Sequence, residues 1–151
     1  MKALILTNYE VTQKERYLIE CSSVLKIAVN WAWYLADYRV AQDQYYEDEI
    51  LSQFSEQLIQ YSPFPIQSRK KRITIDHTLW FSYGSITTAI SLAIQKGCED
   101  ILLVADNTIH QDKFKQGIKD AVNVLKSKAN IYQCSNGNFE LPTISIQEFL
   151  R

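Results

Sequence analysis

A continuous apolar run at residues 101–105 stands between two segments with helical periodicity. A run of this length, bounded by polar residues, is typical of a strand that is covered on both faces, as in a parallel sheet. Helical patterns over residues 85–96 and 112–126 flank the run, and residues 130–133 predict a further strand. This order of elements is the repeating unit of a doubly wound sheet. The sequence therefore predicts an α/β fold: a single three-layer Rossmann-like domain with a mostly parallel sheet.

Both helical patterns have an apolar face, which predicts that each helix packs on the sheet. In the first helix, Ser85 suits the N-cap and Gly97 suits the position after the last turn. Its apolar positions are Ile86, Ala89, Ile90, Ala93 and Ile94. The inner face of the second helix is formed by Phe114, Ile118, Ala121, Val122 and Leu125. A short capped helix is expected at residues 145–150.

The first half of the chain fits the same alternation. Residues 3–7, 24–29 and 38–41 predict strands, and residues 14–20 predict a helix between the first two. Residues 45–49, three of which are acidic, predict the start of a further helix. These elements extend the predicted sheet toward the N-terminus.

Residues 56–80 have a less regular pattern. Residues 58–61 and 72–75 have strand character, but Pro63 and Pro65 interrupt the region. The pattern predicts one strand followed by an irregular crossover.

The charges are almost balanced, with 16 Lys and Arg against 17 Asp and Glu. The net charge therefore gives no reason to expect nucleic-acid or anionic-membrane binding. No apolar stretch approaches the roughly 20 residues that span a bilayer, and the N-terminus lacks a signal-peptide cleavage site. The three cysteines are widely spaced, which favours neither a metal site nor a disulfide framework. We expect a soluble, cytoplasmic protein with reduced thiols, no nucleic-acid partner and no stable membrane insertion; a homo-oligomer is left open.

Short polar side chains follow the predicted strands. Asn8, Asn30, Asp43 and Asp106 stand at the ends of four of them. Ligands of open α/β sheets bind outside the carboxyl ends of the strands, where these side chains can hydrogen-bond a ribose, a base or a phosphate-linked metal. Asn and Asp also end strands simply because they form turns. Their coincidence at one end of the sheet favours a shared groove.

The turn before residue 86 is a candidate phosphate site. Ser82, Gly84 and Ser85 precede or open the predicted helix, where unpaired N–H groups and the helix dipole attract anions. Gly84 also fits a close turn without any ligand. The chain has neither a G-x-G-x-x-G motif nor a P-loop, which counts against an ordinary dehydrogenase or kinase. The basic run Arg69–Arg72 fits a solvated loop, or a site for a phosphate or an acidic acceptor.

Acid–base chemistry has two histidine candidates. His110 lies just past Asp106, near the predicted groove, whereas His77 lies in the irregular crossover. His110 is therefore the candidate general base, with helix capping as its alternative role. The aromatic cluster from Trp31 to Tyr38 fits core packing, or stacking on a base. The spacing of His and Cys predicts no metal site, and no cofactor is assigned.

Three blocks of the chain share a common order of features. Ile27–Trp33 followed by Ala36–Asp43 has a strand-Asn-strand-Asp pattern. A second block has the order small residue, Gly, helix, Gly, strand, Asp; it consists of Ser82–Gly84, Ala89, Ala93, Gly97 and Glu99–Asp106. The third block is the ending, formed by Ile131–Ser135, Leu141–Pro142 and Ile144–Leu150. These blocks resemble bacterial glycosyltransferase-like proteins, a group with the motility accessory factors, the archaeal pterin diphosphokinases and the lipooligosaccharide sialyltransferases.

The resemblance implies a nucleotide or nucleotide-sugar site formed by Asn8, Asn30, Asp43 and Gly84. The family's Gly-Asn-Gly-Pro-Ser turn after the first strand is Thr7–Val11 here, which keeps the Asn and has neither glycine. The sialyltransferases place a catalytic histidine well downstream of the Asp block, and this chain has none after residue 110. Sialyl transfer itself is therefore not expected.

Two functions remain open from the sequence. The first is a nucleotide- or nucleotide-sugar-dependent transferase in surface glycan biosynthesis, with Asn8, Asn30 and Asp43 on the nucleotide. Asp106 or His110 then lies near the transferred group. The second is a non-catalytic Rossmann-like module that binds a ligand or a protein, which the missing glycines favour. The sequence specifies neither donor nor acceptor.

Overall fold

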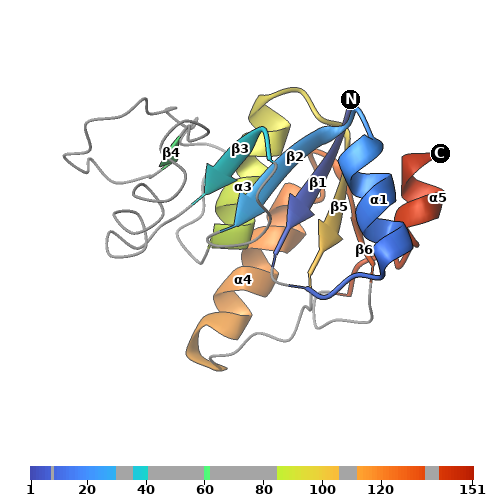
Figure 1. The fold of residues 1–151 in the computed structure, drawn as a ribbon. Helices are drawn as coiled ribbons and strands as arrows, with labels where there is room; N and C mark the ends of the chain where they lie inside the picture. Colours follow the sequence, from blue (N-terminus) through green and yellow to red (C-terminus); the bar gives the residue numbers. More distant parts are fainter. Residues whose placement is uncertain (8, 30–35, 41–59, 62–84, 106–111, 135–139) are drawn as a thin grey trace.

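A computed structural model describes residues 1–7, 9–29, 36–40, 60–61, 85–105, 112–134 and 140–151 (Figure 1). In this part of the chain the strands form one six-stranded sheet in the order β4-β3-β2-β1-β5-β6, and every pairing is parallel. The strands are β1 (Lys2–Leu6), β2 (Leu25–Val29), β3 (Tyr38–Val40), β4 (Gln60–Tyr61), β5 (Asp100–Val104) and β6 (Asn130–Gln133). The predicted α/β, Rossmann-like fold is confirmed.

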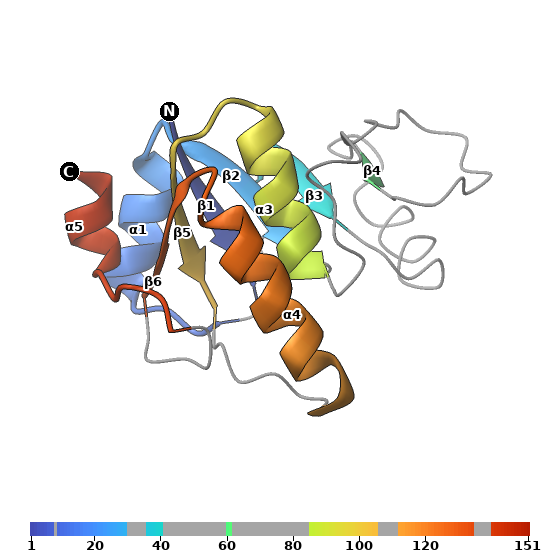
Figure 2. The ribbon, with the colours of Figure 1, turned by 180° about the vertical axis from the view of Figure 1, so that it is seen from behind.

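Helices cover both faces of the sheet, which gives three layers (Figure 1, Figure 2). The described helices are α1 (Gln13–Cys21), α3 (Ser85–Gln95), α4 (Asp112–Leu125) and α5 (Ile146–Leu150). Helices α1 and α5 contact each other on one face, and α3 and α4 contact each other on the other. Each helix that the sequence predicts within the described residues is present, with ends that differ by at most one residue.

Two buried clusters lie between these layers. The α3–α4 core contains Ala3, Ile5, Ile27, Val29, Val40, Ala89, Ile90, Leu92, Ala93, Ile101, Leu103, Val122 and Leu125 among others. The α1–α5 core contains Leu4, Leu6, Ile19, Leu102, Val104, Ile146 and Phe149. Neighbouring residues of β1 and β5 alternate between the two cores because successive side chains of a strand point to opposite faces. The continuous apolar run of β5 is therefore explained by burial on both faces.

Helix α3 differs from its sequence pattern in the burial of its polar residues. Thr87, Thr88 and Ser91 are completely buried, whereas the apolar residues Ile86 and Ile94 are only partly buried. The Ser91 hydroxyl donates to the carbonyl of Thr87, 2.9 Å away, which satisfies the hydroxyl without water.

Gly97 ends α3 in the conformation that the sequence predicts. Its φ is +87°, and its N–H donates to the carbonyl of Ile94 over 2.9 Å. The N–H of Cys98 donates to the carbonyl of Ala93 over 3.0 Å. These two bonds form a Schellman motif, which turns the chain from α3 toward β5.

Replacing Gly97 by alanine is expected to lower the free energy of unfolding by about 1–2 kcal/mol, because a Cβ is unfavourable in the left-handed region. No heavy atom lies within 4 Å of the position that the Cβ would take, so the cost comes from the backbone alone. Urea denaturation measures it. Gly97→Asn is the matched control, since Asn tolerates this conformation better and should lose less. Equal stability of the alanine variant and the original chain would contradict the motif.

The segment after β6 folds back along the outer edge of that strand. The N–H of Gln133 donates to the carbonyl of Pro142 over 3.0 Å, and the N–H of Ile144 donates to the carbonyl of Gln133 over 2.9 Å. The buried side-chain amide of Gln133 donates to the carbonyl of Leu141 over 2.8 Å. Gln133 and Thr143 thereby form a parallel bridge that leads into α5.

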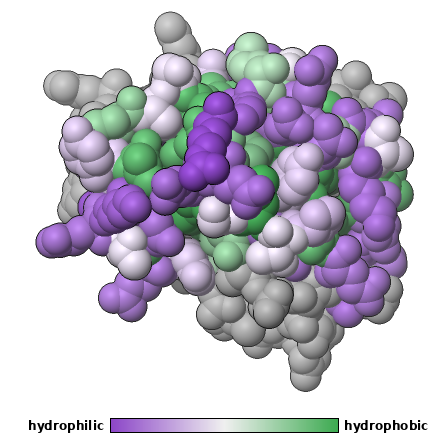
Figure 3. Space-filling model, turned by 90° about the vertical axis from the view of Figure 1, so that its right-hand side faces the viewer, coloured by the Kyte–Doolittle hydropathy of each residue, from purple (hydrophilic) through white to green (hydrophobic). Residues whose placement is uncertain are grey.

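The side of the molecule on which α5 lies, at the right in Figure 1, is mainly hydrophilic (Figure 3). Hydrophobic side chains show there only as small areas between polar ones. This pattern is that of helices with one face on a core and the other in water. Among the described residues no helix combines the length and apolar character needed to cross a membrane.

Candidate functional site

The strand order reverses between β1 and β5. From β1 the chain places β2, β3 and β4 successively on one side, and it then crosses to place β5 and β6 on the other. Leu6 and Val104, the last residues of β1 and β5, are register partners. Their carboxyl ends therefore lie side by side at a topological switch point, which is the place where open α/β sheets bind ligands.

Thr7 joins the two strand ends at this point. Its N–H and its hydroxyl both donate to the carbonyl of Val104, each over 3.1 Å. The hydroxyl also accepts from the N–H of Tyr9 over 3.3 Å. Sequence reasoning considered Asn8 here and missed Thr7, although a threonine directly after a strand is a known turn signal. The Thr7 side chain thus links the end of β1 to β5 and to the backbone of Tyr9.

The N-terminus of α1 is capped by its own side chains. The Thr12 hydroxyl accepts from the N–H of Glu15 over 3.2 Å, and the Glu15 carboxylate accepts from the N–H of Thr12 over 2.9 Å. This capping box uses N–H groups that a phosphate would bind in a helix N-terminal anion site. It also places a negative charge there. The first helix of the fold is therefore not organised as a phosphate site.

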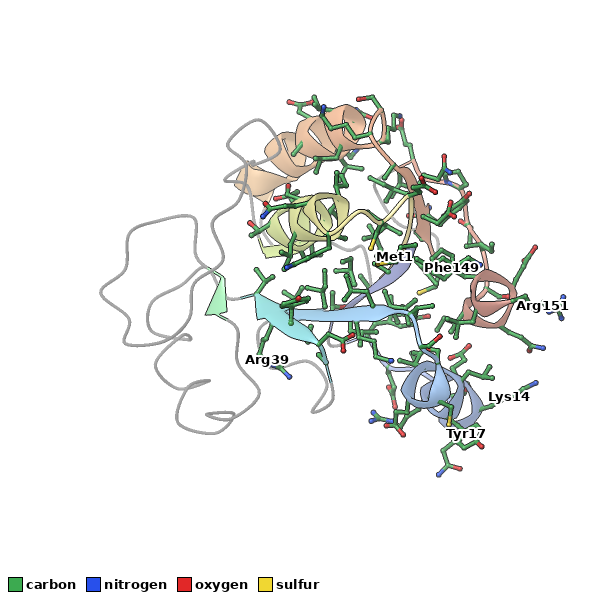
Figure 4. The ribbon with its side chains drawn as sticks, turned by 90° about the horizontal axis from the view of Figure 1, so that it is seen from above. Met1, Lys14, Tyr17, Arg39, Phe149 and Arg151 are labelled. Carbon is green, nitrogen blue, oxygen red and sulfur yellow. The ribbon has the colours of Figure 1, made fainter. Side chains whose placement is uncertain are left out.

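Arg39 is a buried cation that sequence reasoning did not select. It lies on β3 with 4% of its surface exposed. Figure 4 shows its side chain on the side of the sheet where α1 lies. Burial lowers its pKa to about 10, so the guanidinium stays protonated at neutral pH. The sequence did contain a signal for a buried cation here, because Arg39 stands between Tyr38 and Val40 in a segment with a strand pattern.

Cys134 lies directly after β6, close to the switch point. Its N–H donates to the carbonyl of Leu103 over 3.2 Å. Burial raises the pKa of its thiol, although a hydrogen bond with the backbone of Ala105 acts in the opposite direction. The thiol is thus held in its neutral form near the ends of β5 and β6. All three cysteines are free, as the sequence predicts.

The free energy of unfolding is expected to fall as the pH rises above about 9. Burial raises the pKa of both Cys98 and Cys134 above the ordinary value of 9.0, so the unfolded chain loses these protons first. Their stabilising contribution is complete below pH 9 and is lost above it. Urea denaturation at pH 8 and pH 10 measures the change. In the double variant Cys98→Ala and Cys134→Ala, the pH dependence should be weaker; an unchanged dependence would assign it to other groups.

The predicted site residues other than Ser85 lie outside the described residues: Asn8, Asn30, Asp43, Ser82, Gly84, Asp106 and His110. The same holds for His77, for Trp31 and for the basic run 69–72. The strand ends that precede the predicted residues are nevertheless confirmed, since β1, β2, β3 and β5 end at Leu6, Val29, Val40 and Val104. In a parallel sheet these ends lie on one side of the domain. That the side chains converge on one groove stays a prediction.

Within the described residues no group of three or more His, Cys, Asp or Glu side chains is arranged to hold a metal ion.

The chain matches no protein-family model, and it matches no curated protein. The resemblance to glycosyltransferase-like proteins is thus a hypothesis that the sequence blocks alone support.

Proposed function

We propose that the protein binds a nucleotide or nucleotide-sugar at the carboxyl end of its sheet and acts as a transferase in surface glycan biosynthesis. The single observation that carries the proposal is the switch point between β1 and β5. In the sequence, predicted site residues come shortly after the strands that end on this side of the sheet. Asn8 and Asp106 each follow the last residue of their strand by two positions, and Asn30 follows β2 directly.

In dinucleotide-binding proteins the phosphate lies at the N-terminus of the first helix. In this proposal it lies at another helix. The N-terminus of α1 is satisfied by Thr12 and Glu15, so it is a poor phosphate site. The first turn of α3, which begins at Ser85, lies at the same end of the sheet (Figure 1). The N-terminus of α3 is therefore the helix end that suits the phosphate.

A non-catalytic module that binds a ligand or a protein is the second candidate, and the same capping box favours it. A Rossmann-like fold whose first turn has no glycine and whose first helix has a closed N-terminus can keep the groove without the chemistry. No group is transferred in that case, and Asp106 and His110 serve only as turn and helix-capping residues.

Nucleotide binding is the first test. Thermal unfolding is followed with CMP-, UDP- and GDP-sugars and with the free nucleotides. A ligand at a hundred times its dissociation constant is expected to stabilise the protein by about 2.7 kcal/mol. Asn30→Ala should abolish that stabilisation, whereas Asn123→Ala, on an exposed position of α4, should keep it. No stabilisation by any of these compounds would refute the nucleotide site.

Turnover separates the two candidates once a nucleotide-sugar is found to bind. A transferase releases the nucleotide from its sugar in the presence of an acceptor, and liquid chromatography of the products detects the release. His110→Ala should lose this release and retain binding, since the imidazole is the proposed base. Binding without release over a broad set of acceptors favours the module.

A further inference from the structure

We propose that residues 140–151 form an edge strap that opens as one unit while the rest of the sheet stays folded. The edge strap consists of the extended segment 140–145 and helix α5, and it passes around the outer edge of β6. The inference rests on how this segment is attached to the domain. It does not depend on nucleotide binding, so it goes beyond the proposed function.

The edge strap contributes to both buried clusters of the domain. Leu141 belongs to the α3–α4 core, whereas Ile146 and Phe149 belong to the α1–α5 core. The segment therefore passes from one face of the sheet to the other within a few residues. It does so around β6, which is the outermost strand on this side of the sheet.

Gln133 of β6 holds the first half of the edge strap. Its N–H donates to the carbonyl of Pro142 over 3.0 Å, and its carbonyl accepts from the N–H of Ile144 over 2.9 Å. Its buried side-chain amide donates to the carbonyl of Leu141 over 2.8 Å and to the Thr143 hydroxyl over 3.4 Å. Because these bonds meet at one residue, residues 141–144 are released from β6 together.

The second half of the edge strap is helix α5, which is held from the other face. Phe149 lies on the sheet side of the helix, whereas Arg151 lies on its outer side (Figure 4). The Lys2 ammonium donates to the Phe149 carbonyl over 2.6 Å and lies 5.2 Å from the centroid of its ring. A helix of this length does not persist in water alone, so α5 keeps its form only while it is docked.

The two halves are short and directly joined, which makes them one unit. Ile144 pairs with β6 and also packs on the α1–α5 core, and the next residue, Ser145, caps α5 by accepting from the N–H of Glu148 over 3.1 Å. Local opening of proteins occurs in such contiguous units. Strands β1 and β5, in contrast, have a paired strand on each side and a core on each face, so they open only with the whole domain.

Opening of the edge strap changes the carboxyl end of the sheet. Ile144 and Cys134 pack on the α1–α5 core together with Tyr9, whose N–H bonds to the Thr7 hydroxyl at the switch point. Removal of Ile144 and α5 uncovers this cluster. The edge strap is thus a device by which the end of the sheet that carries the candidate site changes without global unfolding.

Amide hydrogen exchange, followed residue by residue by NMR in the full chain, tests the proposal. Gln133 and Cys134 are a matched pair of neighbours. The N–H of Gln133 donates to Pro142 of the edge strap, whereas the N–H of Cys134 donates to the carbonyl of Leu103 on β5 over 3.2 Å. The first amide therefore reports the edge strap and the second reports the sheet.

We expect the Gln133 amide to exchange together with those of Ile144 and Phe149. After correction for intrinsic rates, the amides of Cys134 and β5 should exchange at least about 10-fold more slowly, because they wait for global unfolding. Low concentrations of urea separate the two groups further. Opening of the edge strap exposes little surface and should depend weakly on urea, whereas exchange of the β5 amides should depend on it steeply.

Two variants decide whether the unit is separate and whether it is cooperative. Ile27→Val weakens the sheet at a fully buried position of β2, with β1 and β5 between it and β6. It should speed exchange in β5 by about 2- to 10-fold and leave the edge strap unchanged, because the closed and open forms both contain the altered sheet. Phe149→Leu should speed exchange throughout the edge strap, Gln133 included, by about 5- to 100-fold. Val124→Ala, at an exposed position of α4, should change neither.

Three results would overturn the proposal. Equal acceleration of β5 and the edge strap in Ile27→Val would mean that the segment opens only with the whole domain. Acceleration in Phe149→Leu that does not reach Gln133, or no acceleration at all, would mean that the segment is not one unit. Identical exchange and urea dependence of Gln133 and Cys134 would also contradict it. No ligand enters these measurements, so the proposed function is tested separately.

Discussion

Replacing Phe149 by alanine is expected to lower the free energy of unfolding by about 3–5 kcal/mol, the usual cost of removing a buried aromatic ring. Phe149 lies in the α1–α5 core with 3% of its surface exposed. Its ring packs edge-on against that of Tyr132, with centroids 6.1 Å apart. The ammonium of Lys2 lies 5.2 Å from the ring centroid and donates to the Phe149 carbonyl over 2.6 Å.

The expected loss is large because α5 has little stability of its own. A helix of five residues, Ile146–Leu150, does not persist in water without tertiary contacts. Ile146 and Phe149 are its buried residues, so the alanine variant keeps only Ile146 as a fully buried side chain, beside the partly buried Leu150. Urea denaturation measures the effect, and Val124→Ala, at an exposed site on α4, is the control with a change within about 0.5 kcal/mol. A loss no greater than that control would mean that α5 is not docked as described.

Leu103→Ala is expected to lower the free energy of unfolding by about 2–5 kcal/mol. Leu103 is fully buried on β5, between β1 and β6, and faces the α3–α4 core. Deleting its side chain leaves a cavity beneath two helices, and the paired strands limit how far the backbone can collapse into it. The residue is thus among those whose truncation should affect the whole sheet.

The matched control is Leu103→Met, which keeps the volume and should cost less than about 1.5 kcal/mol. Both variants are compared by urea denaturation with the slope of the transition monitored. A similar, small loss in both variants would contradict close packing at this position. A large loss in both would point to a requirement for the shape of leucine rather than for its volume.

Much of the fold was predictable from local patterns. The run at 101–105 predicted a strand buried on both faces, and Leu102 and Leu103 indeed belong to opposite cores. Gly97 predicted the end of α3, since a left-handed residue is needed there. These predictions succeeded because each depends on a few consecutive residues whose periodicity or backbone preference is strong.

Other features depend on contacts between distant segments, and local patterns do not contain them. The burial of Thr87, Thr88 and Ser91 is decided by what packs around α3, because their own polarity predicts an exposed face. Arg39 became notable only when its burial on β3 was known. Thr7 likewise joins β1 to β5 across 97 residues of sequence. The candidate site is thus predicted in its position and not in its complete set of residues.

The backbone hydrogen bonds of Gln133 affect how copies of the protein can associate through the edge of the sheet. An exposed outer strand offers free N–H and C=O groups to a neighbouring molecule, and edge-to-edge pairing of this kind leads to aggregation. Here Pro142 and Ile144 already occupy both groups of Gln133. A second copy could add a strand at this end of β6 only by displacing residues 141–144. The chain therefore protects this part of its sheet against self-association by strand addition.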